Sequence, residues 1–382
     1  MIARRAFCAG AASLLAPLAR AAPPVPDFAA AIATRLASFP PGPALLNSYL
    51  VRTGPRATKF DHTQANAAYV YDNALAGLLL LATGRKSQAQ RIADALAIAQ
   101  KHDRFYHDGR LRNAYQAGPM SRPAKLPGWW DKTTNSWAED PYQVGSATGP
   151  IAWAMLLWAA LGMHAPAEAA AHFINTSLRA PTGYYGGFYG FEPHPIKLTW
   201  QSTEQNTDLY AVFTKLGRVP DAAHAAAFVH AMFDAKTNLF GAGTTPAGAR
   251  NSLIAADAGI WPYLAGLGSE SSSRAVINAL RQGNGIGFST ASHGIWLEGT
   301  AFASLALAKS PMAASFQATI TANIARQGYV YATVAPSLST GLTIGPSLDK
   351  NTPEQAFNYY RRPALSATAW AGLAAHGVNP LA

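Results

Sequence analysis

Cysteine is nearly absent from this sequence. The one cysteine, Cys8, lies in an apolar stretch at the N-terminus. Without that stretch the chain has no means of forming a disulfide, a thiolate metal site or a cysteine nucleophile. Charge is also scarce, because Asp, Glu, Lys and Arg make up 13% of the residues while hydrophobic residues make up 49%. This composition excludes a disordered chain and indicates a globular protein with a large core.

Several functional motifs are missing as well. The histidines show no H-E-x-x-H spacing, and the sequence has no P-loop, no G-x-S-x-G elbow and no Asp-rich calcium loop. The GNGIGF segment at 283–288 has no strand before it, so it does not indicate a dinucleotide site. We therefore expect no cofactor and no bound metal. The net charge is +10, but the basic residues are scattered, which argues against a nucleic-acid partner.

Residues 1–22 are expected to form an export signal. Arg4 and Arg5 precede a short apolar run, and Ala19-Arg20-Ala21 gives an A-x-A cleavage pattern. The paired arginines resemble a twin-arginine signal, and a general secretory signal also fits. The apolar run is too short to span a bilayer, so no integral membrane segment is expected in the mature chain. These features predict a periplasmic or secreted protein whose residues 23–382 form one domain.

Six segments of the chain follow one pattern, a polar or acidic start and then an Ala/Leu-rich helix. They cover 71–84, 145–162, 202–217, 255–268, 296–309 and 365–377. Most are apolar nearly all round, so they must be enclosed on every side. Between them lie helices with a single apolar stripe, at 26–38, 87–102, 166–179, 220–233, 271–282 and 311–327. An inner ring sheathed by an outer ring satisfies both patterns, which predicts an all-α fold, an (α/α)6 toroid in a single domain.

The connections between these helices are unequal in length. An inner helix reaches the next outer helix within a few residues, whereas long connections precede the inner helices at 103–145, 181–201, 234–254, 283–295 and 328–364. Loops of such length in a compact domain are typically functional or disordered, and these are rich in Gly, Trp and Tyr, which favours ordered loops. All of them should emerge where the inner helices begin. That face is expected to carry the functional site.

Acidic residues are concentrated at the same face. Asp72, Glu204, Asp208, Asp257 and Glu298 fall in the first turns of inner helices, and Asp140 falls just before one. Acidic residues also cap helix N-termini, which is an alternative explanation for any one of them. Glu204 and Asp208 lie four residues apart and so share one helix face. Two such carboxylates cannot both ionise freely, so one pKa rises and a general acid becomes available.

Glycoside hydrolysis needs this arrangement of an acid and a second carboxylate. The catalytic candidates are Glu204, Asp72, Asp140, Asp208 and Glu298. For Asp208, a buried hydrogen-bond network is the competing explanation. Flat aromatic side chains suit the faces of sugar rings, although some of them will instead pack the loops. The substrate-binding candidates are Trp129, Trp130, Trp137, Tyr184, Tyr185, Trp200, Arg112, Asn113, Trp296 and Tyr360.

The repeated hairpins, with YDNA at 71–74, STEQNTD at 202–208 and WLEG at 296–299, resemble the six-hairpin glycosidase superfamily. This resemblance implies a carbohydrate-active protein with its site in the bowl at the inner-helix N-termini. The superfamily includes glycoside hydrolases, sugar epimerases, polysaccharide lyases and lanthionine cyclases. The Asp-x-Asp pattern of its bacterial endoglucanases is missing here, and the zinc ligands of the cyclases are absent for lack of cysteine.

The leading hypothesis is an exported glycoside hydrolase that cleaves an oligo- or polysaccharide with inversion, Glu204 being the acid. The base would be Asp72, Asp140 or Glu298, and the inverting assignment follows the resemblance together with room for a water between carboxylates on different helices. Three alternatives stay open. A polysaccharide lyase would use Arg112 or Asn113 to neutralise a uronate, with Tyr115 or His107 as base. A glycan-binding or assembly factor would need only the aromatic residues, and an epimerase would need paired histidines such as His164 and His293.

Overall fold

The computed structural model describes residues 26–348 and 353–382, so the expected export signal at 1–22 lies outside the described residues. Within the described ranges the chain forms thirteen α-helices and eighteen short strands. Most of the helices fall within a few residues of their predicted positions, which confirms the helical part of the prediction. Among these helices none combines the length and apolarity that a bilayer crossing requires.

Six helices pack against one another in a closed succession. Each contacts the next, and the last contacts the first, in the order α3, α5, α7, α9, α11 and α13. We call them the inner helices. Their bounds are α3 Val70–Ala82, α5 Thr148–Ala160, α7 Thr203–Lys215, α9 Ala256–Leu264, α11 Leu297–Ala306 and α13 Leu365–Ala375. Nearly every residue of α5 and α13 is buried, as their all-round apolar sequences require.

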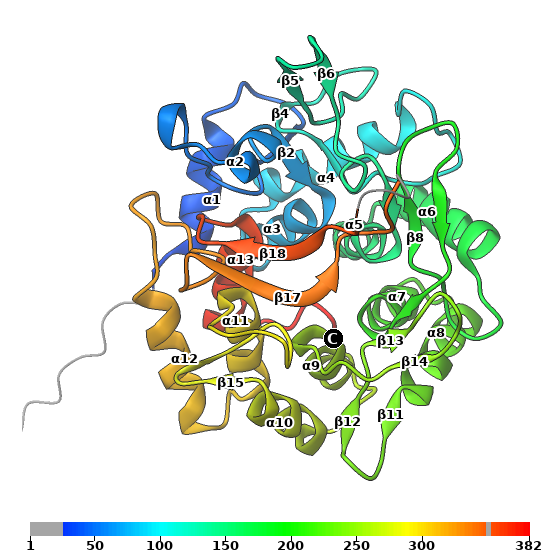
Figure 1. Ribbon diagram of the computed structural model, residues 1–382, viewed down its shortest axis with the longest axis vertical. Helices are drawn as coiled ribbons and strands as arrows, with labels where there is room; N and C mark the ends of the chain where they lie inside the picture. Colours follow the sequence, from blue (N-terminus) through cyan, green and yellow to red (C-terminus); the bar gives the residue numbers. More distant parts are fainter. Residues whose placement is uncertain (1–25, 349–352) are drawn as a thin grey trace, which may run out of the picture.

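A second set of helices lies outside this ring, with α6, α8, α10 and α12 at the periphery in Figure 1. Their bounds are α1 Phe28–Ala37, α4 Lys86–Lys101, α6 His164–Phe173, α8 Val219–Ala231, α10 Glu270–Ala279 and α12 Pro311–Thr321. Five of these helices pack on the inner helix that precedes them, and α1 packs on α13 and α3. Helix α4 buries only one stripe, which includes Ile92, Leu96 and Ala99. Two short helical pieces were not predicted, α2 Lys59–Thr63 and a 3₁₀ turn at Gly54–Arg56. The helix predicted at 166–179 ends in a π-helix at Ile174–Leu178.

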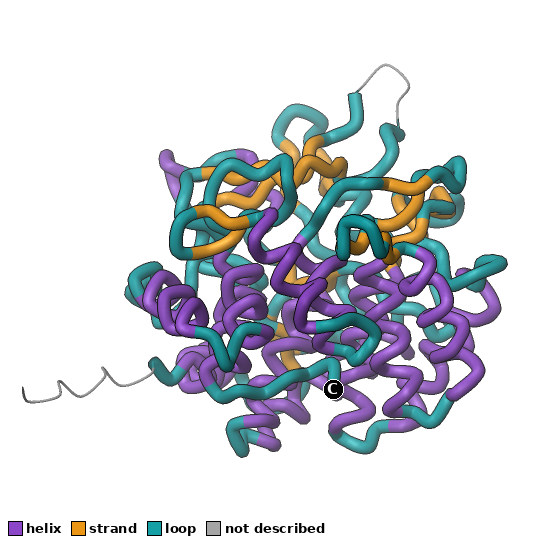
Figure 2. Tube along the Cα trace, turned by 90° about the horizontal axis from the view of Figure 1, so that it is seen from below, coloured by secondary structure: helices purple, strands orange, loops and turns teal. Residues whose placement is uncertain are grey.

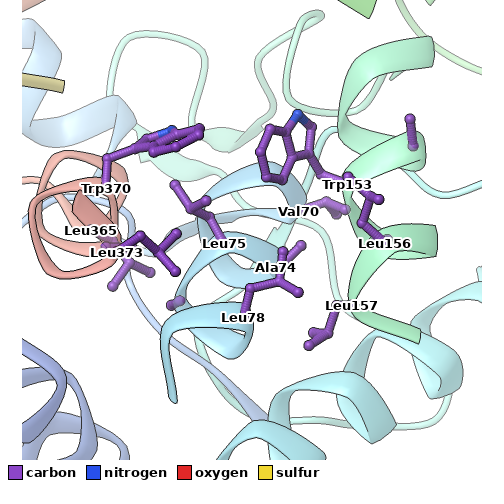
Figure 3. Packing of buried hydrophobic residues seen from close by; sticks show 14 of the residues in the cluster. Val70, Ala74, Leu75, Leu78, Trp153, Leu156, Leu157, Leu365, Trp370 and Leu373 are labelled. Carbon is purple, nitrogen blue, oxygen red and sulfur yellow. The ribbon is translucent and has the colours of Figure 1, made fainter. Parts of the chain in front are cut away.

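Glycines allow the inner helices to approach closely. A Cβ at Gly77 of α3 would lie 2.6 Å from Leu157 Cδ2 of α5, and a Cβ at Gly372 of α13 would lie 2.5 Å from Leu79 Cδ2 of α3. A glycine inside a helix costs roughly 1 kcal/mol relative to alanine, so these glycines are explained by the packing that they permit. Figure 3 shows the resulting core between α13, α3 and α5, with side chains of all three helices interlocked.

The strands lie in the connections and gather at one end of the molecule, above the helices in Figure 2. Their bounds are β1 Ala44–Leu45, β2 Ala67–Tyr69, β3 Ala114–Gln116, β4 Gly118–Pro119, β5 Trp129–Asp131, β6 Ser136–Ala138, β7 Ser146–Ala147, β8 Gly187–Tyr189, β9 Ile196–Leu198, β10 Gln201–Ser202, β11 Phe233–Asp234, β12 Leu239–Phe240, β13 Gly243–Thr244, β14 Arg250–Asn251, β15 Arg281–Gln282, β16 Gly285–Ile286, β17 Ser337–Thr343 and β18 Ala356–Tyr360. They pair antiparallel in eight sheets of two or three strands among the described residues.

The all-α prediction did not include these sheets. They form because backbone N–H and C=O groups that are withdrawn from water must find partners even where the sequence has no helical period. Three of the strands, β2, β7 and β10, run directly into α3, α5 and α7. The strand pairing therefore fixes the first turn of these inner helices, which is where the acidic residues were predicted to act.

Candidate active site

Five carboxyl groups from four inner helices lie close enough to shift one another's pKa, at the end of the ring where the strands lie. We call them the carboxylate cluster, and its members are Asp72 of α3, Glu204 and Asp208 of α7, Asp257 of α9 and Glu298 of α11. Burial raises the pKa of Glu204 well above its ordinary value, and the charges of Asp257, Asp208 and Glu298 raise it further. Burial followed by the charge of Glu298 raises the pKa of Asp72 well above its ordinary value. The cluster therefore keeps protons to a higher pH than isolated carboxyl groups would.

Glu298 is the most firmly oriented member of the cluster. The Tyr71 hydroxyl donates to its Oε1 at 2.5 Å, and the Ser366 hydroxyl donates to its Oε2 at 2.7 Å. The indole N–H of Trp370 in turn donates to the Tyr71 oxygen at 2.8 Å. Burial raises the pKa of Glu298 to about 7, and the two hydrogen bonds oppose that rise because they favour the ionised form.

Asp257 is tied to the start of α9, where its Oδ1 accepts the backbone N–H of Ala258 at 2.7 Å. Burial raises its pKa to about 6, and the backbone hydrogen bonds limit the rise. Sequence reasoning placed Asp257 at an inner-helix start but did not select it as a catalytic candidate. The structure gives it the largest charge effect on Glu204.

Glu204 and Asp208 both belong to the cluster, as their shared helix face predicted. Glu204 is half-buried, whereas Asp208 is fully buried. Neither carboxylate oxygen of Asp208 accepts a hydrogen bond from a described residue. The indole N–H of Trp153 lies near enough to lower the pKa of Asp208 but does not meet hydrogen-bond geometry. The alternative of a buried hydrogen-bond network around Asp208, through Asn206, Tyr210 or a neighbouring helix, is not observed among the described residues. The Asn206 amide instead bonds the backbone of Tyr184 and Ser202.

Asp140 lies apart from the cluster and has a structural role. Its Oδ1 accepts the backbone N–H groups of Tyr142 and Gln143, which closes the turn before β7. Burial raises its pKa, and these N–H groups together with Lys59 oppose the rise. Its charge raises the pKa of Tyr142, which Glu204 and Asp72 also affect, so that tyrosine lies between Asp140 and the cluster. Capping is therefore the better explanation for Asp140.

Aromatic rings fill the middle of the inner ring. Tyr71 and Trp153 pack edge to face at 5.3 Å, and Trp153 packs edge to face on Trp261 at 5.3 Å and on Trp370 at 5.8 Å. Figure 3 shows the indoles of Trp153 and Trp370 next to each other, with Leu75 of α3 below them. The middle of the ring is thus a packed core.

Several predicted aromatic residues lie at the surface. Trp130 and Trp137 are 56% and 47% exposed and sit directly opposite each other on β5 and β6, while Trp129 is half-buried. Tyr185 and Trp200 are half-buried, with the Trp200 ring against Gly186. Tyr360 is half-buried and packs on Phe60 at 4.6 Å between ring centroids. These six residues remain substrate-binding candidates.

Four other candidates are enclosed in the protein, and for them the structure gives a packing role. Arg112 is fully buried and makes a bidentate pair with Asp103 at 2.7 and 2.8 Å. The buried Asn113 amide bonds the backbone of Tyr142 and Ala147. Tyr184 lies against the outer helix α8, and Trp296 packs on Phe288, Phe302 and Tyr359.

The residues required by the alternative functions are not gathered at the cluster. Besides Asp103, Arg112 bonds Glu192 and the Val144 carbonyl, so its charge is compensated. The Tyr115 hydroxyl accepts the backbone N–H of Arg112 and is buried. His107, His164 and His293 are exposed. Among the described residues no group of three or more His, Cys, Asp and Glu side chains is placed to hold a metal ion.

Two cavities lie outside the carboxylate cluster. One of about 550 Å³ lies between α1 and the segment 47–51, and one of about 400 Å³ lies beside α4. Tyr49 lines the first cavity, and its pKa is raised well above the ordinary value by burial and then by the charge of Asp72. Tyr49 therefore stands between this cavity and the carboxylates.

No family model matches the sequence, and the search of curated proteins found no match. Solved structures do match the fold. A glycosidase is 12% identical with a TM-score of 0.61, covering 94% of this chain and 98% of its own. An alpha-amylase from Clostridium perfringens is 10% identical with a TM-score of 0.58, covering 92% and 97%. A sugar epimerase from a ruminal bacterium is 11% identical with a TM-score of 0.57, covering 91% and 96%. The chain thus has a glycosidase-like fold over nearly its whole length.

Proposed function

We propose that this protein is an exported glycoside hydrolase that cleaves an oligo- or polysaccharide with inversion. In this proposal the closed succession of inner helices and its outer helices form an (α/α)6 toroid of the six-hairpin type. Residues 1–22 direct export and are removed, and the mature chain acts in the periplasm or outside the cell. The glycosidase-like fold and the strand-bearing end of the ring support this assignment.

The observation that carries the proposal is the carboxylate cluster. Glu204 is its half-buried member, so a glycosidic oxygen can reach it, and its raised pKa favours the protonated form that a general acid needs. Glu298 is held from two sides by Tyr71 and Ser366, and its pKa of about 7 suits a group that alternates between the two protonation states. The cluster thus supplies an acid and a base in different environments.

Hydrolysis would proceed by a single displacement. Glu204 donates its proton to the glycosidic oxygen as the bond from that oxygen to the anomeric carbon breaks. A water attacks the anomeric carbon from the opposite face, and Glu298 accepts the proton that this water loses. Proton exchange with solvent then restores Glu204 and Glu298. The charges of Asp257 and Asp208 raise the pKa of Glu204 and so favour the acid form that enters the first step.

The same cluster argues against a lyase. Carboxylates at the inner-helix starts would repel a uronate, and Arg112, the expected neutralising residue, is bound to Asp103 and Glu192. An epimerase that relies on paired histidines is not favoured either, because His164 and His293 are exposed.

The test compares Glu204→Gln and Glu298→Gln with a matched control. Glu270→Gln serves as that control because Glu270 is on α10, pairs with Arg274 and is half exposed. Wild-type protein is incubated with a panel of neutral and charged glycans, and reducing ends and product anomers are measured. Each site variant should lose about 10²–10⁴-fold in rate, as expected for removal of a general acid or base, while the control keeps its activity.

The alternatives predict different results in the same assay. Products with an unsaturated ring would identify a lyase. Glycan binding without cleavage by the wild-type protein would identify a binding or assembly factor. If the Glu204→Gln variant cleaves glycans at the wild-type rate, Glu204 is not the general acid.

A further inference from the structure

The carboxylate cluster holds more carboxyl groups than hydrolysis uses. Glu204 and Glu298 account for the acid and the base, which leaves Asp72, Asp208 and Asp257. Among the described residues, no Lys, Arg or His contributes to the electrostatic environment of any member of the cluster. Buried carboxyl groups in proteins are normally paired with a cation or fully hydrogen-bonded. The cluster therefore lacks a positive partner.

Three buried acceptor atoms at or beside the cluster also lack a donor at hydrogen-bonding geometry, although the indole N–H of Trp153 lies near Asp208. They are both carboxylate oxygens of Asp208 and the Oε1 of Gln205, and within the part of the chain that the structure describes none of them accepts a hydrogen bond. The two side chains lie together against α5, because a Cβ at Gly149 would be 3.4 Å from Asp208 Oδ2 and 3.6 Å from Gln205 Cδ. Unsatisfied buried acceptors in one place point to a ligand that brings its own donors.

We propose that the substrate is an amino-sugar glycan, and that Asp208 and Gln205, with Asp257 beside them, bind its protonated amine. An ammonium group supplies three N–H donors and one positive charge, which matches three free acceptors in an uncompensated acidic site. A hydroxyl supplies one donor and no charge, and an acetamide supplies one N–H with a bulky acyl group. This inference rests on the proposed hydrolase function, because it names the substrate of the same site.

The position of Asp208 fits an amine next to the bond that is cleaved. In a 2-amino sugar the amine is attached to the carbon beside the anomeric carbon. Asp208 follows the acid Glu204 by four residues, about one helical turn, so an amine-binding group lies beside the proton donor.

Binding of an ammonium group should release protons. Burial and the charge of Asp257 raise the pKa of Asp208 well above its ordinary value, so Asp208 keeps its proton to a higher pH than an isolated carboxyl group. A cation bound beside it favours the ionised form, and the proton leaves. The titratable groups that face Asp208 are Glu204 on its own helix and Asp257 on α9. Helix α5 carries none, and on α8 Asp221 is paired with Arg179 and Arg218 while His224 bonds backbone carbonyls.

The test measures binding of monosaccharides that differ only at one carbon, so it does not depend on the linkage. Glucosamine, glucose and N-acetylglucosamine, and galactosamine with galactose, are titrated into the full chain by calorimetry in buffers of different ionisation heat. At least one amine should bind about tenfold or more tightly than its neutral counterpart and release protons at neutral pH. Asp208→Asn should remove this preference, and Glu270→Gln should keep it.

Equal binding of the amine and its neutral counterpart, no binding of either amine, or a preference that survives in a folded Asp208→Asn variant would overturn the inference. The proposed function is judged separately, from the loss of glycan cleavage in Glu204→Gln. The protein could cleave neutral glycans in a reaction that depends on Glu204 and leave chitosan-type and other amino-sugar glycans intact. This result would overturn the amine preference, and the hydrolase assignment would stand.

Discussion

The hydroxyl of Tyr71 donates to Oε1 of Glu298 at 2.5 Å, although the two residues are 227 positions apart in the chain. This contact joins the inner helices α3 and α11. Because Trp370 of α13 donates to the Tyr71 oxygen, the contact also reaches a third inner helix. Burial and the charge of Glu298 raise the pKa of Tyr71 well above its ordinary value, so the tyrosine stays protonated and remains the donor. Tyr71 is thus a positioning residue for the proposed base.

Tyr71→Phe should move the acidic limb of the pH–rate profile to higher pH. The hydrogen bond from Tyr71 lowers the pKa of Glu298, which burial has raised to about 7, so its removal lets that pKa rise. A base must be deprotonated, and activity that falls below this pKa will then begin to fall at higher pH. At neutral pH the rate should drop by about tenfold for each unit that the limb moves.

The matched control for this measurement is Tyr263→Phe, a tyrosine of α9 outside the cluster. Its profile should coincide with that of the wild-type protein. An unmoved acidic limb in Tyr71→Phe would show that Glu298 is not the group whose ionisation limits the rate at low pH.

Asp257→Asn should move the basic limb of the pH–rate profile to lower pH. The charge of Asp257 raises the pKa of Glu204, so its removal lowers that pKa. The acid must be protonated, and activity will therefore be lost at lower pH on the basic side of the profile. The amide oxygen of the replacement can still accept the N–H of Ala258, so the start of α9 should stay intact. If the basic limb of the pH–rate profile stays in place, the charge of Asp257 does not influence the proposed acid, Glu204.

The helices and the face that carries the site could be read from the sequence. The sequence of α5 predicts that the helix is buried, because TGPIAWAMLLWAA has no polar face to expose. The acidic residues at inner-helix starts could be found in the same way, since the helix pattern fixes where each first turn falls. These features depend on local periodicity, which a single sequence contains.

The partners of the site residues could not be read, because they depend on contacts between distant segments. Nothing near Glu298 in the chain indicates Tyr71 or Ser366 as its donors, and nothing near Arg112 indicates that Glu192 compensates it. The exposure of the aromatic residues could not be predicted for a related reason. Trp130 and Trp296 were both predicted to bind substrate, yet one is 56% exposed and the other 2%, because the contacts that cover a ring form only in the folded chain.

Arg112→Ala should destabilise the protein rather than alter its substrate contacts. Removal of Arg112 leaves Asp103 buried without its cation, which typically costs about 3–5 kcal/mol. Arg112 lowers the pKa of Asp103, and Arg104 and Arg112 lower that of Glu192 to about 2. These depressed values mean that the ion-pair contribution to stability is present at neutral pH and is lost as the pH falls from the ordinary carboxyl range towards about 2.

Chemical denaturation at neutral and acidic pH checks this expectation. Arg274→Ala is the control, because its pair with Glu270 is exposed and contributes only about 0.5 kcal/mol. The gap in unfolding free energy between the two variants should narrow on acidification. An Arg112→Ala variant of normal stability that has lost affinity for uronides would instead restore the lyase alternative.

Trp130 and Trp137 should contribute to binding of long glycans without affecting the chemical step. Their side chains lie opposite each other on an exposed hairpin, so the two indoles offer adjacent apolar faces to solvent. Replacing both with alanine should raise KM for a polysaccharide by about tenfold, since each aromatic contact contributes roughly 0.5–1.5 kcal/mol, and should leave kcat unchanged. Phe105→Ala is the matched control, an aromatic residue that is 46% exposed on another loop. Because neither tryptophan touches the carboxylate cluster, a fall in kcat on short substrates would mean that the hairpin reaches the reacting sugar, and the placement of the substrate along this face would have to be revised.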